Sequence, residues 1–173
     1  AGLGSGFYLE VLAPDPAQDL TGTLGALVAG LAAPSLIGWC ARGRDLDAVA
    51  ARLPGAGLAT PGPIAMERTR PDGVHLAWSI LGIGGHGFGA LVPFLIDWRD
   101  SPHPSLNAPA GLSLVDFGLT VPDQGGLSHV LHAIDVQPRV TSGPPGLHAE
   151  VAGPAGRFRL ETVGPVPERT FGL

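Results

Sequence analysis

The sequence has no lysine and only one cysteine, Cys40, among its 173 residues. One cysteine cannot form a disulfide within the chain, and a thiol in the apolar run LIGWCA is typical of a buried, inert side chain in a reduced, cytoplasmic setting. Charged residues make up only 14% of the chain, and the net charge is −5. Nucleic acid is therefore not an expected partner, because its binding depends on basic side chains that neutralise phosphates.

One uncharged stretch has to be weighed as a possible membrane span. Residues 24–41 carry no Asp, Glu, Lys or Arg, but Pro34 and three glycines interrupt them. This pattern indicates a connector followed by a strand and not a membrane span, so no membrane partner is expected. The opening residues lack the basic region and long apolar core of a signal peptide. Because the chain starts without methionine and almost directly in a strand-like pattern, we expect the natural N-terminus to lie upstream.

What is abundant is alanine, glycine, proline and arginine. All ten basic residues are arginine, a composition typical of a GC-rich, bacterial gene. Hydrophobic residues make up 45% of the chain, so it can bury a proper core as one domain or as two closely packed modules.

One order of elements occurs twice along the chain. Residues 35–43 have the pattern of a strand, and 45–53 that of a short helix with Asp45 as its N-cap. Strand patterns then follow at 63–70, 74–81 and 90–98. After a linker, the same order recurs with a strand over 112–121 and a helix over 123–134 capped by Asp123. Its further strands are predicted at 136–142, 146–152 and 156–163.

This repetition predicts an α+β fold of paired βαβββ modules that form a curled mixed sheet around a cavity. Residues 6–16 look like the last strand of an earlier, truncated copy. The predicted division is therefore a remnant strand with a connector (1–34), a first module (35–100), a linker (101–111) and a second module with a C-terminal tail (112–173).

Side-chain alternation along the strands indicates where a site would lie. In the stretch VPFLIDW, Asp97 opposes an apolar set that includes Trp98, and His75 likewise opposes Trp78 on its own strand. If the apolar sets meet the helices, the polar faces line the cavity. His75 is then the candidate general base, since imidazole titrates in a useful range, and Asp97 is a second catalytic candidate.

The second module repeats this pattern with Asp116 and Glu161 on the faces opposite its apolar sets. The alternative is a solvated sheet face whose carboxylates pair with arginines such as Arg68, Arg70 and Arg159. Trp78 and Trp98 either pack beneath the helix or stack on a ligand, with Arg68 or Arg70 holding an anionic group. The glycine-rich stretch at 82–89 does not precede a helix, so it predicts no phosphate loop and no nucleotide cofactor.

These stretches give the chain a family resemblance. It resembles the glyoxalase-like domains of the vicinal oxygen chelate superfamily, through YLEVLAPDP (8–16), DLDAVAARL (45–53), RTRPDGVHLAWSI (68–80) and VPFLIDW (92–98). The resemblance implies paired modules around a cavity in which a divalent metal is often bound. Members include glyoxalases, extradiol dioxygenases, epimerases, thiol transferases and metal-free drug-sequestering proteins, so the fold leaves the function open.

The resemblance also implies a set of metal ligands. The carboxylate of the last strand in each copy matches Glu10, Asp97 and Glu161. The first-strand position matches Asp116 in the second module and Gly38, which has no side chain, in the first. Carboxylates without imidazole suit Mg²⁺, Mn²⁺ or Ca²⁺ better than Zn²⁺ or Fe²⁺.

Three hypotheses of function follow. The first is a lyase or isomerase of the glyoxalase or dioxygenase type, which would use a metal to assist proton transfer in a small organic molecule. The second is a protein that binds or sequesters an apolar or aromatic small molecule without catalysis. The third is a domain of a longer protein or of a homodimer, in which another chain completes the sheet.

Overall fold

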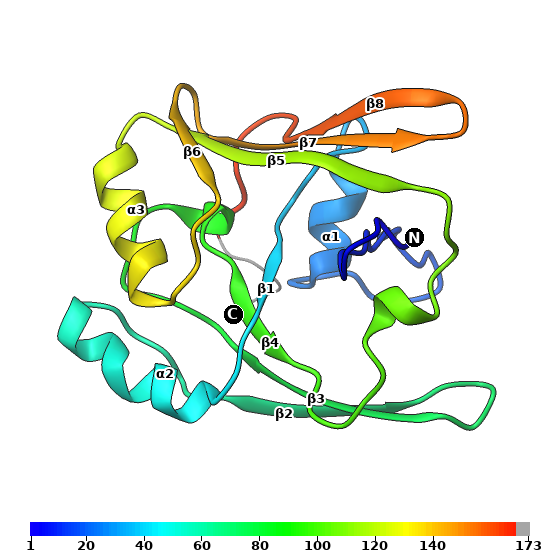
Figure 1. Cartoon of the computed structure of the whole chain (residues 1–173), viewed down its shortest axis with the longest axis horizontal. Helices are drawn as coiled ribbons and strands as arrows, with labels where there is room; N and C mark the ends of the chain where they lie inside the picture. The colour runs from blue at the N-terminus through cyan, green and yellow to red at the C-terminus, as the bar shows by residue number, and fades with distance from the viewer. Residues whose placement is uncertain (169–173) are drawn as a thin grey trace.

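The computed structural model describes residues 1–168, so the predicted tail beyond them lies outside the described residues. In chain order the strands are β1 (Cys40–Arg42), β2 (Ile64–Thr69), β3 (His75–Leu81), β4 (Phe94–Asp97), β5 (Ser113–Val121), β6 (Arg139–Ser142), β7 (Gly146–Gly153) and β8 (Gly156–Glu161). The α-helices are α1 (Leu24–Ala29), α2 (Leu46–Arg52) and α3 (Gln124–Ala133). Short 3-10 turns lie at η1 (Leu53–Ala56), η2 (Gly89–Leu91) and η3 (Pro104–Leu106). Figure 1 shows their arrangement.

The strands form two mixed four-stranded sheets, in the orders β1-β4-β3-β2 and β6-β5-β7-β8. The α+β class and the repeated βαβββ order of elements are therefore confirmed. The two sheets nevertheless differ in pairing. Strand β1 pairs in parallel with β4, the last strand of its unit, whereas β5 pairs in parallel with β6, the strand that directly follows its helix.

Both predicted helices begin where their capping residues stand. The Asp45 carboxylate accepts the Ala48 N–H at 3.2 Å, and the Asp123 carboxylate accepts the Gly126 N–H at 2.9 Å. Each bond satisfies one of the free donors of a first helical turn. The apolar stripes of the helices are buried, with Leu46, Val49 and Leu53 from the first unit and Leu127, Val130, Leu131 and Ile134 from the second.

A single core joins the two units. Buried side chains of both helices and both sheets belong to one contiguous cluster, which includes Leu81 and Leu95 from the first sheet and Leu119 and Leu147 from the second. Helices α2 and α3 lie at the same end of the molecule (Figure 1). They are tied together there by Arg52, whose Nε donates to the Ala133 carbonyl at 3.1 Å.

The segment before β1 runs from one sheet to the other. The Leu36 N–H donates to the Glu161 carbonyl at the end of β8 at 3.0 Å, and Cys40–Arg42 then pairs with β4. Between them, the Trp39 ring lies 5.0 Å from the Phe117 ring, and its indole N–H donates to the Leu91 carbonyl at 3.0 Å. The strand predicted at 35–43 is therefore shortened, because its first half serves as a bridge between the sheets.

The strand predicted at 6–16 is not formed. Tyr8 makes one isolated bridge to Gly2, and the Leu3 carbonyl accepts the Leu114 N–H at the start of β5. Pro14 and Pro16 lack the N–H that a ladder requires, and residues 9–16 belong to no strand. The N-terminal segment instead lies at the end of the molecule opposite α2 and α3 (Figure 1).

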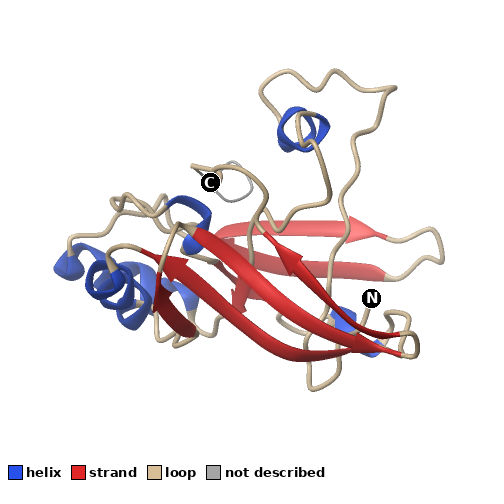
Figure 2. Cartoon of the chain, turned by 90° about the horizontal axis from the view of Figure 1, so that it is seen from above, coloured by secondary structure: helices blue, strands red, loops and turns tan. Residues whose placement is uncertain are grey.

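The uncharged stretch at 24–41 contains the six-residue helix α1, in which no residue is buried, and the first two residues of β1. Figure 2 shows α1 standing apart from both sheets at the tip of a long loop. Within residues 1–168, the structure contains no helix of the length and apolarity that crossing a bilayer requires.

One bulge changes a predicted strand face. The register between β5 and β7 shifts between Leu114 and Asp116, so Leu114 pairs with the buried Val151. The extra residue reverses the alternation on one side of the bulge. As a result Val115 is 44% exposed, although its apolar side chain predicted an inward orientation.

Candidate functional site

The face of the first sheet that packs against α2 is the opposite of the one expected from the sequence. Strand registers place Ala41, Leu81 and Leu95 on one face, and these residues belong to the same core cluster as the stripe of α2. Alternation therefore turns Trp78 and Ile96 away from α2. The prediction that this apolar set meets the helix is wrong, because both faces of the sheet are apolar and α2 covers the other one.

Aromatic rings gather on the face that α2 leaves uncovered. The Trp78 and Trp98 rings lie 5.3 Å apart, between centroids. His103 lies edge-on to Trp98 at 6.4 Å and to Tyr8 at 5.4 Å. Tyr8, Trp78, Trp98 and His103 are all partly exposed, so the rings are anchored and still accessible. We call these four side chains the aromatic cluster.

Tyr8 lies over the first strand of the sheet. Its hydroxyl is 4.0 Å from the Cys40 sulfur. Burial raises the pKa of the Tyr8 phenol, with further contributions from Cys40 and Glu10, and burial likewise raises the pKa of the Cys40 thiol. Both groups are therefore neutral near pH 7, when Tyr8 is a hydrogen-bonding group and Cys40 is a small apolar one.

Trp98 carries the clearest unsatisfied polar group of the cluster. Its indole N–H is buried and has no hydrogen-bond partner within residues 1–168. This N–H lies near the Tyr8 hydroxyl and lowers the pKa of that group, which partly offsets the rise caused by burial. The two groups nevertheless do not meet in hydrogen-bonding geometry. A buried donor without a partner costs roughly 1–3 kcal/mol.

The His103 ring is held with one nitrogen free. Its Nδ1 accepts the Ser105 N–H at 3.3 Å and lies 2.7 Å from the Ser105 hydroxyl. Burial, and next the charge of Arg42, lower the pKa of His103, so the ring is neutral at pH 7. With Nδ1 accepting, the proton lies on Nε2. This N–H has no partner in the described chain, so His103 can donate a hydrogen bond to a ligand.

The two residues predicted as catalytic lie away from this cluster. The Asp97 carboxylate accepts the Arg99 backbone N–H at 2.9 Å and so closes the turn after β4. The His75 side chain is 57% exposed, and its Nε2 lies 3.8 Å from a Glu67 carboxylate oxygen. Asp97 is level with Ser79, four residues along β3 from His75, so strand geometry separates the two by roughly 13 Å. They make no direct contact.

Asp116 and Glu161 belong to the second sheet, on its face opposite α3. Asp116 forms an ion pair with Arg139, and Glu161 lies 3.7 Å from Arg159. His148 lies between them, and its Nε2 is 2.9 Å from Arg139 Nη2. Burial and then Arg139 lower the pKa of His148. This face therefore has the character of the solvated alternative, in which carboxylates pair with arginines.

The family resemblance implies a divalent metal, so the donor set can be tested against one. Asp97 lies on the first sheet, Asp116 and Glu161 lie on the second, and Glu10 lies on the N-terminal segment. Nowhere in residues 1–168 do three His, Cys, Asp or Glu side chains come together as a metal requires. The carboxylates of this chain therefore do not fit a single shared ion.

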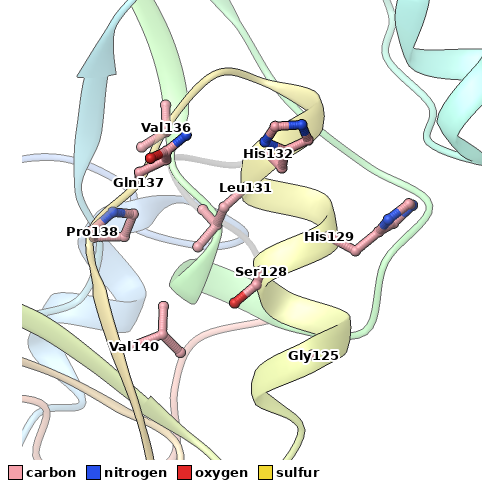
Figure 3. A pocket seen from close by; sticks show the side chains of 9 residues that line it. All are labelled: Gly125, Ser128, His129, Leu131, His132, Val136, Gln137, Pro138 and Val140. Atoms are coloured by element: carbon pink, nitrogen blue, oxygen red, sulfur yellow. The ribbon is translucent and has the colours of Figure 1, made fainter.

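Two surface hollows lie elsewhere. The larger, of about 470 Å³, lies between α3 and β6, and Figure 3 shows Ser128 turned toward β6 and His129 turned away from it. The second, of about 340 Å³, lies against the glycine-rich loop, where His86 bonds both Ile83 and Phe88 backbone groups. Burial lowers the pKa of His86, which fits a neutral ring that locks the loop. Neither hollow is lined by a residue selected from the sequence.

Of the residues selected from the sequence, the structure brings together Trp78 and Trp98, with Arg68 on the same face across β2. Tyr8 and His103 were missed as members of the cluster. The signal for Tyr8 was its position two residues before Glu10, because alternation along a strand would place both side chains on the same face. His103 lies in the segment 101–111 that the composition indicated as a linker, where no pattern predicts a contact with Trp98.

Comparison with known proteins gives the family. A family model described as a glyoxalase-like domain matches residues 1–134. The match spans most of the chain, so the chain belongs to the glyoxalase-like domain family and the resemblance is confirmed. The chain is also similar to the crystal structure of a hypothetical protein from Staphylococcus aureus, with a TM-score of 0.49 and 19% identity. That similarity covers 75% of this chain and 54% of the other, so the chain spans about half of its length. No curated protein matches.

Proposed function

We propose that this glyoxalase-like chain binds a small organic molecule on the aromatic cluster of its first sheet. The observation that carries this proposal is the series of ring contacts from Trp78 through Trp98 and His103 to Tyr8, on the face opposite α2, with the buried Trp98 N–H left without a partner in the described chain. Rigid aromatic faces with a few unpaired donors are typical of small-molecule sites.

The binding hypothesis is favoured here over metal-assisted proton transfer. Metal catalysis in this chain would require Glu10, Asp97, Asp116 and Glu161 to converge, and they lie on three different parts of the structure. His75 also lacks the contact with Asp97 that a catalytic pair would use. The cluster supports recognition through stacking and hydrogen bonds, which matches the non-catalytic alternative.

The test uses a neutral probe, naphthalene-2-carboxamide, and calorimetric titration. The wild-type protein should bind it saturably, and Trp98→Ala should weaken binding by about tenfold or more, because stacking area and an N–H donor are both lost. Trp39→Phe is the matched control, since Trp39 packs on Phe117 in the core, away from the cluster. No binding to the wild type, or equal weakening by both substitutions, would contradict the proposal.

A further inference from the structure

Two arginines flank the aromatic cluster without ion pairs. Arg42 lies on β1 and Arg68 on β2, the two edge strands of the first sheet. Neither has a carboxylate partner within residues 1–168. The arginines that do pair with carboxylates lie elsewhere, namely Arg52, Arg70, Arg139, Arg157 and Arg159.

Arg42 lies directly beside the cluster. It is level with Ile96 on the neighbouring strand β4, and Trp98 follows two residues later on the same face. Its positive charge also reaches the His103 ring, where it disfavours protonation. The guanidinium, the Trp98 indole and the His103 imidazole therefore lie at one end of the aromatic cluster.

Three hydrogen-bond donors lie at this end. They are the Arg42 guanidinium, the unpaired Trp98 N–H and the free His103 N–H. By register and alternation, the strands place no carboxylate on this face. Glu10 is an acidic side chain at the margin, exposed and next to Tyr8 and Cys40. A site with stacked rings and neighbouring donors is complementary to a flat molecule that ends in an anionic oxygen.

We infer that the ligand of the aromatic cluster is a planar carboxylate, whose ring stacks on Trp78 and Trp98 and whose carboxylate accepts hydrogen bonds from Arg42. This inference rests on the proposed function and names the chemical class of its ligand. The His103 N–H supplies a second donor to the same carboxylate. Arg68 lies on the far side of Trp78, diagonally across from it on β2, so it is too remote to share the carboxylate of a single-ring ligand.

The test compares two probes of equal size, naphthalene-2-carboxylate and naphthalene-2-carboxamide, by calorimetry at low ionic strength. The wild type should bind the carboxylate about tenfold more tightly, the increment that a charge-assisted hydrogen bond supplies. Arg42→Gln should remove this preference and leave carboxamide binding unchanged. Arg44→Gln is the control, because Arg44 is also exposed and unpaired but lies beyond the end of β1.

Glu10→Gln sharpens the result. Removing this nearby negative charge should strengthen binding of the carboxylate and not of the carboxamide. Equal affinity of the wild type for both probes, or a carboxylate preference that survives Arg42→Gln, would overturn the inferred ligand class. The proposed function would still stand in that case if Trp98→Ala weakened both probes, and it would fail if neither probe bound.

The other occupant of this face would be a second copy of the chain. Ile64 and Met66, 39% and 42% exposed, lie on the same face of β2 as the cluster. Sedimentation at the assay concentration should show a monomer that binds the carboxylate. A dimer that Met66→Asp dissociates, and that binds the probe only after dissociation, would show that this face is a contact between copies and overturn the inference.

Discussion

The two sheets of this protein bury one face in the same way and use the other face differently. One face of each sheet packs against a helix through apolar side chains that belong to the common core. Opposite its helix, the first sheet presents Trp78, Ile96 and Cys40, with two arginines left unpaired at its edges. Opposite its own helix, the second sheet presents Asp116, Arg139, His148 and Glu161, which pair with one another or with neighbours.

This difference separates a satisfied surface from an unsatisfied one. On the second sheet each charge has a partner, so a ligand would have to displace an existing ion pair. On the first sheet Arg42 has no carboxylate partner and the buried Trp98 N–H has no hydrogen-bond partner in the described chain, so an anionic ligand at Arg42 would displace no ion pair. The distribution of unused hydrogen-bonding groups, and not the number of charges, therefore distinguishes the candidate site.

The largest expected effect tests whether the two sheets form one unit. Leu81→Ala removes a fully buried side chain of the first sheet from the common core. It should lower the free energy of unfolding by about 2–5 kcal/mol. Urea unfolding followed by circular dichroism should still show one transition, because both sheets share that core. Separate transitions, with the second sheet unaffected, would mean that the modules are independent. Leu106→Ala is the control, since Leu106 is 75% exposed.

The next effect concerns the charged face alone. A Cβ at Gly118 would lie 2.6 Å from His148 Nε2 and 3.2 Å from the Arg139 carbonyl. Gly118→Ala should therefore displace His148 and destabilise the fold by about 1–3 kcal/mol. At Gly146 the nearest atom would be 3.4 Å away, so Gly146→Ala should cost less. Similar urea midpoints for the two variants would refute this account of the charged face.

A smaller effect is the dependence of stability on pH. The pKa of His148 is lowered in the fold from its ordinary value of 6.5, so the unfolded chain binds the proton more readily. Stability should then fall as the pH drops from about 7 toward 5. His148→Asn should flatten this slope, and His103→Asn should do the same on the aromatic face, where burial and Arg42 act in the same direction. Thermal melts across this pH range measure both, and unchanged slopes would contradict the assignment.

The smallest effect separates stability from binding. Arg157 makes an exposed ion pair with Glu150 at 2.8 Å, and such pairs contribute roughly 0–1 kcal/mol. Arg157→Gln should barely change the melting temperature and should leave carboxylate binding unchanged. Arg42→Gln should also spare the melting temperature, yet reduce that binding. Equal effects of the two substitutions on binding would place the anion preference in overall charge and not at the cluster.

Local signals in the sequence were sufficient for much of the fold. Asp45 and Asp123 cap the helices that they were expected to cap, and the apolar stripes that follow are buried. The order of strands within each sheet could not be derived, because it depends on which distant edges pair. The same local order thus yields β1 beside β4 in one unit and β5 beside β6 in the other.

The site was only partly predictable for a related reason. Alternation places Trp78 and Trp98 on one face, and ligand stacking was one of the two roles considered for them. It could not decide which face α2 covers, since Leu81 and Leu95 make the opposite face equally apolar. Tyr8 and His103 reach the cluster from segments without regular structure, so no periodicity announces them. The catalytic roles assigned to His75 and Asp97 stay predictions, and the structure does not place the two side chains in contact.

The most direct test of the account is a map of amide and indole chemical shifts on addition of naphthalene-2-carboxylate. The account predicts saturable shifts of the Trp78 and Trp98 indole signals and of backbone amides in β1, β3 and β4, with β5–β8 unaffected. Shifts confined to the second sheet, or to the hollow between α3 and β6, would contradict it.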